Sequence, residues 1–206
     1  MGNKQKRPLG RPPYQVNHIP TDEVILQVSA KLFLERPYQD ISMDEIAAAA
    51  DVTKATVYYY FANKSELYAK SMDCMMGRIR MNIRAMISQR KSLKENLLDV
   101  TVSHLTATFH LDLDALLQSA KNVLLEKDWE RMSLAIRLLE EEIAAVFQYA
   151  KERGEIADDF SVSFCSQAFL SLLKIGNKRD VKGNLIYESP KAAAEQIVRF
   201  FCKGVS

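Results

Sequence analysis

The chain has 206 residues, of which 48% are hydrophobic and only seven are glycine, so it is long enough to bury a substantial core in one or two domains. Its formal net charge of +2 is nearly neutral, so any affinity for a polyanion must come from local placement of charge rather than from a basic whole. The sequence has no apolar run of transmembrane length and no signal-peptide pattern, and we expect a cytoplasmic protein without a membrane partner.

The first twenty residues contain several prolines and no acidic side chain. This composition predicts a disordered basic arm over residues 1–20, with the cations Lys4, Lys6, Arg7 and Arg11. The run KRPLGRPP resembles an AT-hook, an element that lies in the minor groove of A·T-rich DNA, although Leu9 stands where a basic residue is expected. The resemblance implies that Arg7 and Arg11 enter a minor groove. A merely solubilising tail or a cloning remnant is the alternative.

A first helix is predicted over residues 21–36. Its apolar side chains recur at helical spacing, and they are Val24, Ile25, Val28, Leu32 and Phe33. We expect Thr21 or Asp22 to cap its start and Pro37 to end it.

Residues 41–68, ISMDEIAAAADVTKATVYYYFANKSELY, are the most informative stretch of the chain. Ser42, followed three residues later by Glu45, predicts a capping box at the start of a helix that runs through four alanines. Asp51 breaks this helix, and Thr53 is a suitable N-cap for a second helix over residues 54–61. Asn63 or Ser65 can cap a third. Two short helices around a tight turn indicate a helix-turn-helix, whose second helix fits the major groove of DNA.

The second of these helices has one predicted buried side. At roughly 100° per residue, Val57 and Phe61 fall together as the core stripe. The opposite side carries Ala55, Thr56 and Tyr59.

Tyr58 and Tyr60 fall on the two flanks of the helix. There a phenol can rest its ring on the protein and donate its hydroxyl to a DNA phosphate. Three consecutive tyrosines cannot all face one core, and exposed aromatic side chains near Lys54 and Lys64 indicate a binding surface. The alternative is that VYYYF is a core stripe.

Residues 42–67 resemble the DNA-binding motif of the TetR-type transcriptional regulators. The resemblance is carried by residues 43–47, 52–56, 58–61 and 63–67. It implies phosphate contacts from Ser42, Tyr58, Tyr60 and Lys64, and contacts with base edges from Thr53, Lys54, Ala55, Thr56 and Tyr59. One position departs from the family pattern: Asp51 stands at the turn position usually held by glycine, and it tolerates a left-handed backbone less well than glycine does.

The rest of the chain is predicted to be helical, which makes the fold all-α. An N-terminal three-helix DNA-binding domain would span residues 21–66, and a larger helical domain for effector binding and dimerisation would span residues 67–206. The predicted helices of the larger domain are residues 65–89, 92–110, 113–125, 129–153, 161–175 and 190–202. We expect Ser92 and Asp128 to cap the second and fourth of these helices, and Gly154 to follow the end of the fourth. The fifth should be mostly buried, and Ser189 and Pro190 should open the sixth.

The resemblance also implies a homodimer, in which the last two helices of each subunit form a four-helix bundle. The predicted interface residues are Phe164, Phe169, Leu173, Ile197 and Phe201, with Leu170, Leu172, Val198 and Phe200 beside them. A two-fold dimer places two recognition helices in successive major grooves, so the operator in double-stranded DNA should be palindromic. The alternative is that these apolar side chains are only internal core.

By the same resemblance, residues 93–153 would form an effector pocket. The candidate lining residues are His104, Thr108, Trp129, Met132 and Phe147. Single side chains of these types on an apolar helix are more often ordinary core residues. An apolar domain and eight methionines are compatible with a small hydrophobic effector, whose identity the sequence does not give.

Cys74, Cys165 and Cys202 are far apart and lack the C-x-x-C spacing of a zinc or redox site, so we predict free thiols, no metal and no cofactor. No catalytic motif is recognisable, which argues against an enzyme. The sequence thus favours a sequence-specific regulator, most simply a repressor that an effector releases from DNA. The alternatives are a helical enzyme or carrier, and a helical interaction module that uses its basic arm on anionic surfaces without sequence preference.

Overall fold

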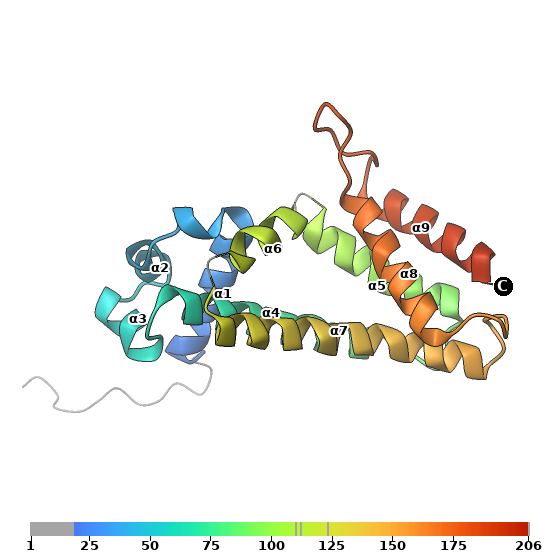
Figure 1. Ribbon diagram of the computed structural model, residues 1–206, viewed down its shortest axis with the longest axis horizontal. Helices are drawn as coiled ribbons and strands as arrows, with labels where there is room; N and C mark the ends of the chain where they lie inside the picture. Colours follow the sequence, from blue (N-terminus) through green and yellow to red (C-terminus); the bar gives the residue numbers. More distant parts are fainter. Residues whose placement is uncertain (1–18, 110, 112, 123, 206) are drawn as a thin grey trace, which may run out of the picture.

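The computed structural model describes residues 19–109, 111, 113–122 and 124–205. In this part of the chain the elements are α1 (Thr21–Glu35), the 3-10 helix η1 (Tyr38–Asp40), α2 (Met43–Ala49), α3 (Lys54–Tyr60), α4 (Lys64–Met86), α5 (Leu93–Thr108), α6 (Leu113–Lys121), α7 (Glu126–Glu152), α8 (Val162–Leu173), the 3-10 helix η2 (Lys174–Asn177) and α9 (Pro190–Val205). Figure 1 shows an elongated molecule with α1, α2 and α3 at one end and α8 and α9 toward the other.

The all-α fold predicted from the sequence is confirmed. The described residues form helices, and their one β-type pairing is an isolated bridge between Arg179 and Leu185. None of the described helices is long and apolar enough to cross a bilayer.

Two hydrophobic cores lie toward the two ends of the molecule. The most buried side chains of the first, among α1 to α4, include Ile25, Phe33, Ile46, Val57 and Leu67. The first core also contains Ala120 of α6 and Met132 of α7, so the N-terminal helices pack against the larger helical part. The second core lies among α5, α7, α8 and α9, around Leu97, Leu105, Phe147, Phe169 and Phe201. Removal of these side chains from water is the main stabilisation at each end.

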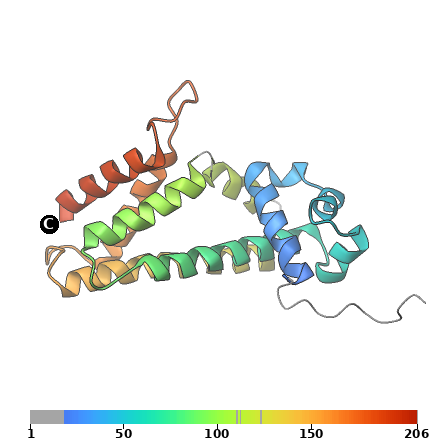
Figure 2. The same ribbon diagram turned by 180° about the vertical axis from the view of Figure 1, so that it is seen from behind.

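The long helices α4 and α7 connect the two ends and run side by side in the same direction (Figures 1 and 2). Arg84 of α4 donates from Nε to Glu142 of α7 at 2.7 Å, and Arg80 lies 3.5 Å from the same carboxylate. Because α4 passes from the first core into the second without a break, the division of the chain between residues 66 and 67 stays a prediction.

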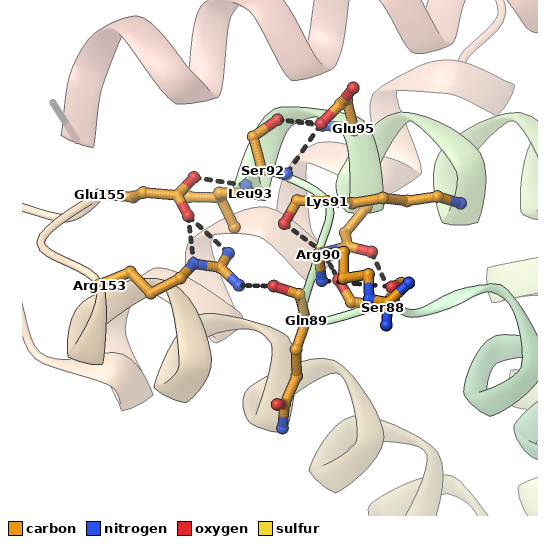
Figure 3. A network of polar contacts seen from close by, with 10 residues as sticks. Ser88, Gln89, Arg90, Lys91, Ser92, Leu93, Glu95, Arg153 and Glu155 are labelled. Atoms are coloured by element: carbon orange, nitrogen blue, oxygen red, sulfur yellow. Dashed lines mark hydrogen bonds and ion pairs between the residues drawn. The ribbon is translucent and has the colours of Figure 1, made fainter.

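A polar network ties the far end of α4 to α5 and α7 (Figure 3). The Glu155 carboxylate accepts a hydrogen bond from the backbone N–H of Leu93 at the start of α5. Arg153 donates from Nε to Glu155 at 2.6 Å and from Nη1 to the Gln89 carbonyl at 2.8 Å. These bonds satisfy polar groups at helix ends and hold three elements together at one point.

Several helix ends lie where the sequence predicted them. The side chains of Thr53, Asn63 and Ser92 each accept from a backbone N–H three residues further on, as N-caps of α3, α4 and α5. Gly154 follows α7 with a φ of +71°, the left-handed conformation that favours glycine after a helix.

Two predicted caps are wrong. Helix α1 begins at Thr21 without a side-chain cap, so neither Thr21 nor Asp22 has that role. Asp128 lies inside the first turn of α7 rather than before it, because its buried carboxylate accepts a hydrogen bond from Ser65 of α4. In both cases the residue type suits a cap, but the helix begins earlier than the predicted cap requires.

Candidate nucleic-acid interface

The turn between α2 and α3 sets the direction in which α3 leaves the first core. Asp51 adopts a φ of +53°, in the left-handed region. Its backbone N–H donates to the Ala48 carbonyl at 3.2 Å, and the Val52 N–H donates to the Ala47 carbonyl at 3.0 Å, which closes the end of α2. The short polar side chain of Asp tolerates this conformation at some cost relative to glycine. The tight turn of a helix-turn-helix is therefore present without a glycine.

The start of α2 is fixed by Ser42 and by an ion pair. The Ser42 hydroxyl accepts from the Glu45 N–H at 3.1 Å, as predicted. The Glu45 side chain does not return to Ser42 as a capping box requires, because it pairs with the Arg36 guanidinium at the end of α1. This pair joins α1 to α2, so the predicted box is only half formed.

Helix α3 has a buried side and an exposed side. Val57 and Phe61 are buried in the first core, as their spacing predicted. Tyr59 is 82% exposed, Tyr58 46% and Tyr60 37%. The three phenols thus stand at the surface above an apolar base, and the alternative of a VYYYF core stripe is excluded.

The residues predicted to face base edges gather at the start and outer side of α3. Thr53, Lys54 and Ala55 are exposed, and Thr56 is half-buried. The Thr53 hydroxyl accepts from the Thr56 N–H at 3.1 Å. Lys54 Nζ donates to the Asp44 carboxylate at 2.7 Å, and this hydrogen bond and the charge attraction raise the pKa of Lys54. A contact of Lys54 with DNA therefore requires that its ammonium leave Asp44.

Lys64 is held beside η1. Its ammonium lies 4.2 Å from the ring centroid of Tyr38 and 3.5 Å from the Gln39 carbonyl oxygen. Partial burial lowers the pKa of Lys64, and the nearby carboxylates of Asp40 and Glu45 act in the opposite direction. Neither η1 nor its role in placing Lys64 was predicted from the sequence. The available signal was Tyr38, an aromatic residue directly after the proline that ends the first helix.

The segment from α1 to the start of α4 offers few free cations in the described residues. Residues 21–64 hold four basic and seven acidic side chains, a net charge of −3. Three of the four basic side chains lie next to acids, in the pairs Arg36–Glu45, Lys54–Asp44 and Lys31–Glu35. Since cations supply most of the non-specific affinity for DNA, further positive charge is needed. Its predicted source is the basic arm, whose Arg7 and Arg11 lie outside the described residues.

A buried hydrogen bond joins this end of the molecule to α7. The Ser65 hydroxyl donates to Asp128 Oδ2 at 2.7 Å and accepts from the Leu125 N–H at 3.1 Å. Burial raises the pKa of the neighbouring Tyr38, and the Asp128 carboxylate raises it further. This contact could not be predicted from the sequence, because Ser65 and Asp128 are 63 positions apart in the chain.

The structure places the five residues predicted for an effector pocket on α5 and along α7. Phe147 belongs to the second core and Met132 to the first. Trp129 borders an open surface groove of about 860 Å³ along α7. On α5, Thr108 donates to the His104 carbonyl at 2.8 Å, and burial lowers the pKa of the His104 side chain. Trp129 also packs against the first core, so it shares its surroundings with Met132. That the five side chains line an effector pocket stays a prediction.

The predicted dimer residues also need correction. Phe164 of α8 is 58% exposed and available to a partner. The remaining predicted residues are buried in the chain's own second core, and they are Phe169, Leu173, Ile197 and Phe201. Helical spacing identified apolar positions but not which of them the same subunit already covers. Phe200 of α9 is 71% exposed and is therefore available to a partner instead. Residues 161–175, which were predicted to be mostly buried, are only partly buried.

Comparison with known proteins gives a family match at this site. The family described as "Bacterial regulatory proteins, tetR family" matches residues 25–70. The HTH-type transcriptional activator FasR of Mycolicibacterium smegmatis is 32% identical over 97 residues, which are 44% of this chain and 44% of that protein. The negative transcriptional regulator IcaR of the Staphylococcus aureus biofilm operon icaADBC is 32% identical over 68 residues, 33% of this chain and 36% of that protein. The chain therefore spans less than half the length of these curated relatives.

Solved structures show the same fold over most of the chain. The transcriptional regulator FadR of Bacillus subtilis, in complex with stearoyl-CoA, superposes with a TM-score of 0.70 at 18% identity and covers 89% of this chain and 98% of its own. The reduced form of NemR from E. coli superposes with a TM-score of 0.74 at 14% identity, over 91% of this chain and 98% of its own. At these identities the likeness concerns the fold alone.

Proposed function

The chain belongs to the TetR family of bacterial regulatory proteins, and on this premise we propose that it is a sequence-specific DNA-binding regulator of transcription that acts as a homodimer. The observation that carries the proposal is α3, where three exposed tyrosines stand above the buried Val57 and Phe61. The exposed part of this aromatic face contributes little to the stability of the subunit. It suits contact with a DNA groove and its phosphates.

In the proposed complex the rigid first core presents the start of α3 to base edges. Thr53, Thr56 and Tyr59 lie on the side of α3 that faces away from the core. Tyr58 and Tyr60 flank this side and would donate hydroxyl groups to phosphates, together with Ser42 and Lys64. Lys54 would exchange Asp44 for DNA, and because both partners are exposed this exchange costs little.

A homodimer would place two copies of α3 about 34 Å apart, so that they enter successive major grooves on one side of the duplex. The exposed Phe164 and Phe200 on α8 and α9 supply apolar surface for such a dimer. Two-fold symmetry in the protein then requires a palindromic or nearly palindromic operator.

The proposed output is repression that a small hydrophobic effector relieves. The relatives include a negative regulator and an activator, and the similar FadR structure holds stearoyl-CoA, a molecule with a long apolar chain. The network around Glu155 holds α4 at its far end, whereas Ser65 joins its near end to α7. An effector that shifts α7 relative to α4 would move α3 and change the spacing of the two recognition helices. The binding free energy that is lost for DNA would equal the difference between the effector's binding free energies for the DNA-binding conformation and for the shifted conformation.

The test is selection of bound fragments from the source genome at near-physiological salt, in parallel with the variant Tyr58→Ala/Lys64→Ala. Both side chains lie at the surface of the first core, and circular dichroism checks that the variant remains folded. We expect wild type alone to recover a palindromic site. If both proteins recover DNA without preference, the chain is an interaction module for anionic surfaces, and if neither recovers any, the helix-turn-helix does not bind DNA.

A further inference from the structure

The segment between α8 and α9 projects from the body of the molecule (Figures 1 and 2). Residues 178–186, which we call the hairpin, fold back on themselves: Asp180 N–H donates to the Asn184 carbonyl at 2.8 Å, and Ile186 N–H donates to the Lys178 carbonyl at 3.1 Å. Gly183 allows the reversal with a φ of +85°. The projection therefore has a defined backbone rather than the conformation of a loose loop.

The Asp180 side chain stabilises this shape. Its Oδ1 accepts from the backbone N–H groups of Lys182, at 2.8 Å, and Asn184, at 2.9 Å. These hydrogen bonds lower the pKa of Asp180, so its carboxylate is ionised at neutral pH. At the base of the hairpin, Leu185 and Tyr187 pack against the second core. A segment organised in this way is ready to bind without a large ordering cost.

The surface of the hairpin is unusual for a solvated loop. Val181 at the tip is fully exposed, and Ile186 is 54% exposed. Lys178 and Lys182 are exposed, and within the described part of the chain neither ammonium has an acidic partner. The hairpin thus presents apolar side chains between two available positive charges. Such a surface gains free energy when it meets an apolar patch with acids beside it.

The opposite end of the α8–α9 pair has the matching chemistry. Asp158 and Asp159, in the turn before α8, are exposed, and neither carboxylate forms an ion pair in the portion of the chain that is described. Beside them the ring of Phe160 stacks on the exposed Phe164 at 5.9 Å. The backbone bond from Ala157 N–H to the Val205 carbonyl, at 3.0 Å, fixes this turn to the end of α9. We call residues 158–159 the acidic turn.

We propose that the hairpin of each subunit docks on the acidic turn and the adjacent rings of Phe160 and Phe164 in a second copy of the chain. This inference rests on the proposed homodimer and specifies how it is assembled. In a two-fold dimer with antiparallel α8–α9 pairs, each hairpin lies over the partner's acidic turn, and the contact occurs twice. A parallel arrangement would place hairpin beside hairpin and acidic turn beside acidic turn, so like charges would repel each other. Charge therefore selects the antiparallel dimer.

Two charge-reversed variants test the contact. The first carries Lys178→Glu/Lys182→Glu, and the second carries Asp158→Lys/Asp159→Lys. All four side chains are exposed, and none forms an ion pair with another described residue. Each variant should therefore fold like wild type, which circular dichroism and thermal unfolding check. We expect each variant alone to self-associate at least about tenfold more weakly than wild type in sedimentation velocity at low salt.

Mixing the two variants should restore the dimer. In the heterodimer the reversed hairpin meets the reversed turn, and the native hairpin meets the native turn, so both contacts regain opposite charges. A chain with all four substitutions should also dimerise. Undiminished self-association of both variants, or failure of the folded variants to associate when mixed, would overturn the docking while leaving the dimer itself in place. A monomeric wild type would instead refute the proposed homodimer on which the docking depends.

Discussion

At the scale of single residues, two helices are followed by a residue in the left-handed conformation, and this residue is an aspartate in one case and a glycine in the other. Asp51 follows α2 with a φ of +53°, and Gly154 follows α7 with a φ of +71°. A side chain with a β-carbon is strained in this region, and a polar Asp is strained less than most. The sequence indicated both positions, because glycine after a helix and a short polar residue in a tight turn are local signals.

Asp51→Gly should therefore raise the free energy of unfolding by about 0.5–1 kcal/mol, because it removes backbone strain at the turn. Gly154→Ala is the matched control, since a β-carbon there would meet no atom within 4 Å and only the backbone is affected. It should lower stability by about 1 kcal/mol. Urea denaturation of the two variants and wild type measures both values. A loss of stability in Asp51→Gly would mean that the Asp side chain itself supports the turn.

His104 gives the fold a pH dependence. Burial lowers its pKa from the ordinary 6.5, so the unfolded chain takes up a proton at this side chain before the folded chain does. The contribution of neutral His104 is complete above pH 6.5 and is lost as the pH falls toward its lowered pKa. We expect the stability difference between about pH 7.5 and 5.5 to be smaller in His104→Gln than in wild type. Equal pH dependence in the two proteins would show that the imidazole is equally accessible to protons in both states.

At the scale of the elements, N-cap residues and apolar spacing located the helices but did not show which other helices pack against them. Thr53, Asn63 and Ser92 cap helices as predicted, because an N-cap acts within four residues of chain. Asp128 was assigned a similar role, but its partner is 63 residues away. The same limit applies to α8 and α9, where spacing showed apolar positions but not that Phe169 is covered by its own subunit.

The Ser65–Asp128 hydrogen bond should couple the stabilities of α4 and α7. Ser65→Ala and Asp128→Ala each leave a buried polar partner unsatisfied, and each should cost about 1–3 kcal/mol of unfolding free energy. The double variant removes both partners, so its cost should be clearly less than the sum of the two. Chemical denaturation of all four proteins measures the difference. Additive losses would show that the two groups act independently and that this contact does not transmit movement between the helices.

At the scale of the whole molecule, the fold class and the helix-turn-helix were predictable from the sequence, whereas the surroundings of the candidate pocket residues were not. A helix-turn-helix is continuous in sequence, so its caps, turn and buried stripe are all present in residues 41–68. A pocket collects side chains from several helices, and Met132 and Phe147 of the same helix belong to different cores. Sequence spacing contains no information about which helix lies opposite each side chain.

The net charge of −3 in residues 21–64 is the reason why we propose that the basic arm contributes to DNA binding. Deletion of residues 2–13 should weaken DNA affinity several-fold and reduce its dependence on salt, because fewer counterions are released. Thermal unfolding should not change. Two double variants separate a minor-groove contact from a general charge effect, and they are Arg7→Ala/Arg11→Ala and Lys4→Ala/Lys6→Ala. If the arginines enter the minor groove, the arginine variant should lose more DNA affinity than the lysine variant. Equal losses of affinity would indicate an effect of charge alone. Unchanged affinity in the deletion would rule out a role for the arm.

The most direct test of sequence-specific regulation is the ratio of two dissociation constants, measured at near-physiological salt for the genomic fragment that the protein recovers best and for an unrelated duplex of equal length. We expect a ratio of at least about 10³ for wild type, because base-edge contacts from two copies of α3 add to phosphate binding. Tyr58→Ala/Lys64→Ala should bind both duplexes more weakly. A wild-type ratio near one would contradict sequence-specific regulation, since the chain would then bind DNA as a charged surface without reading its sequence.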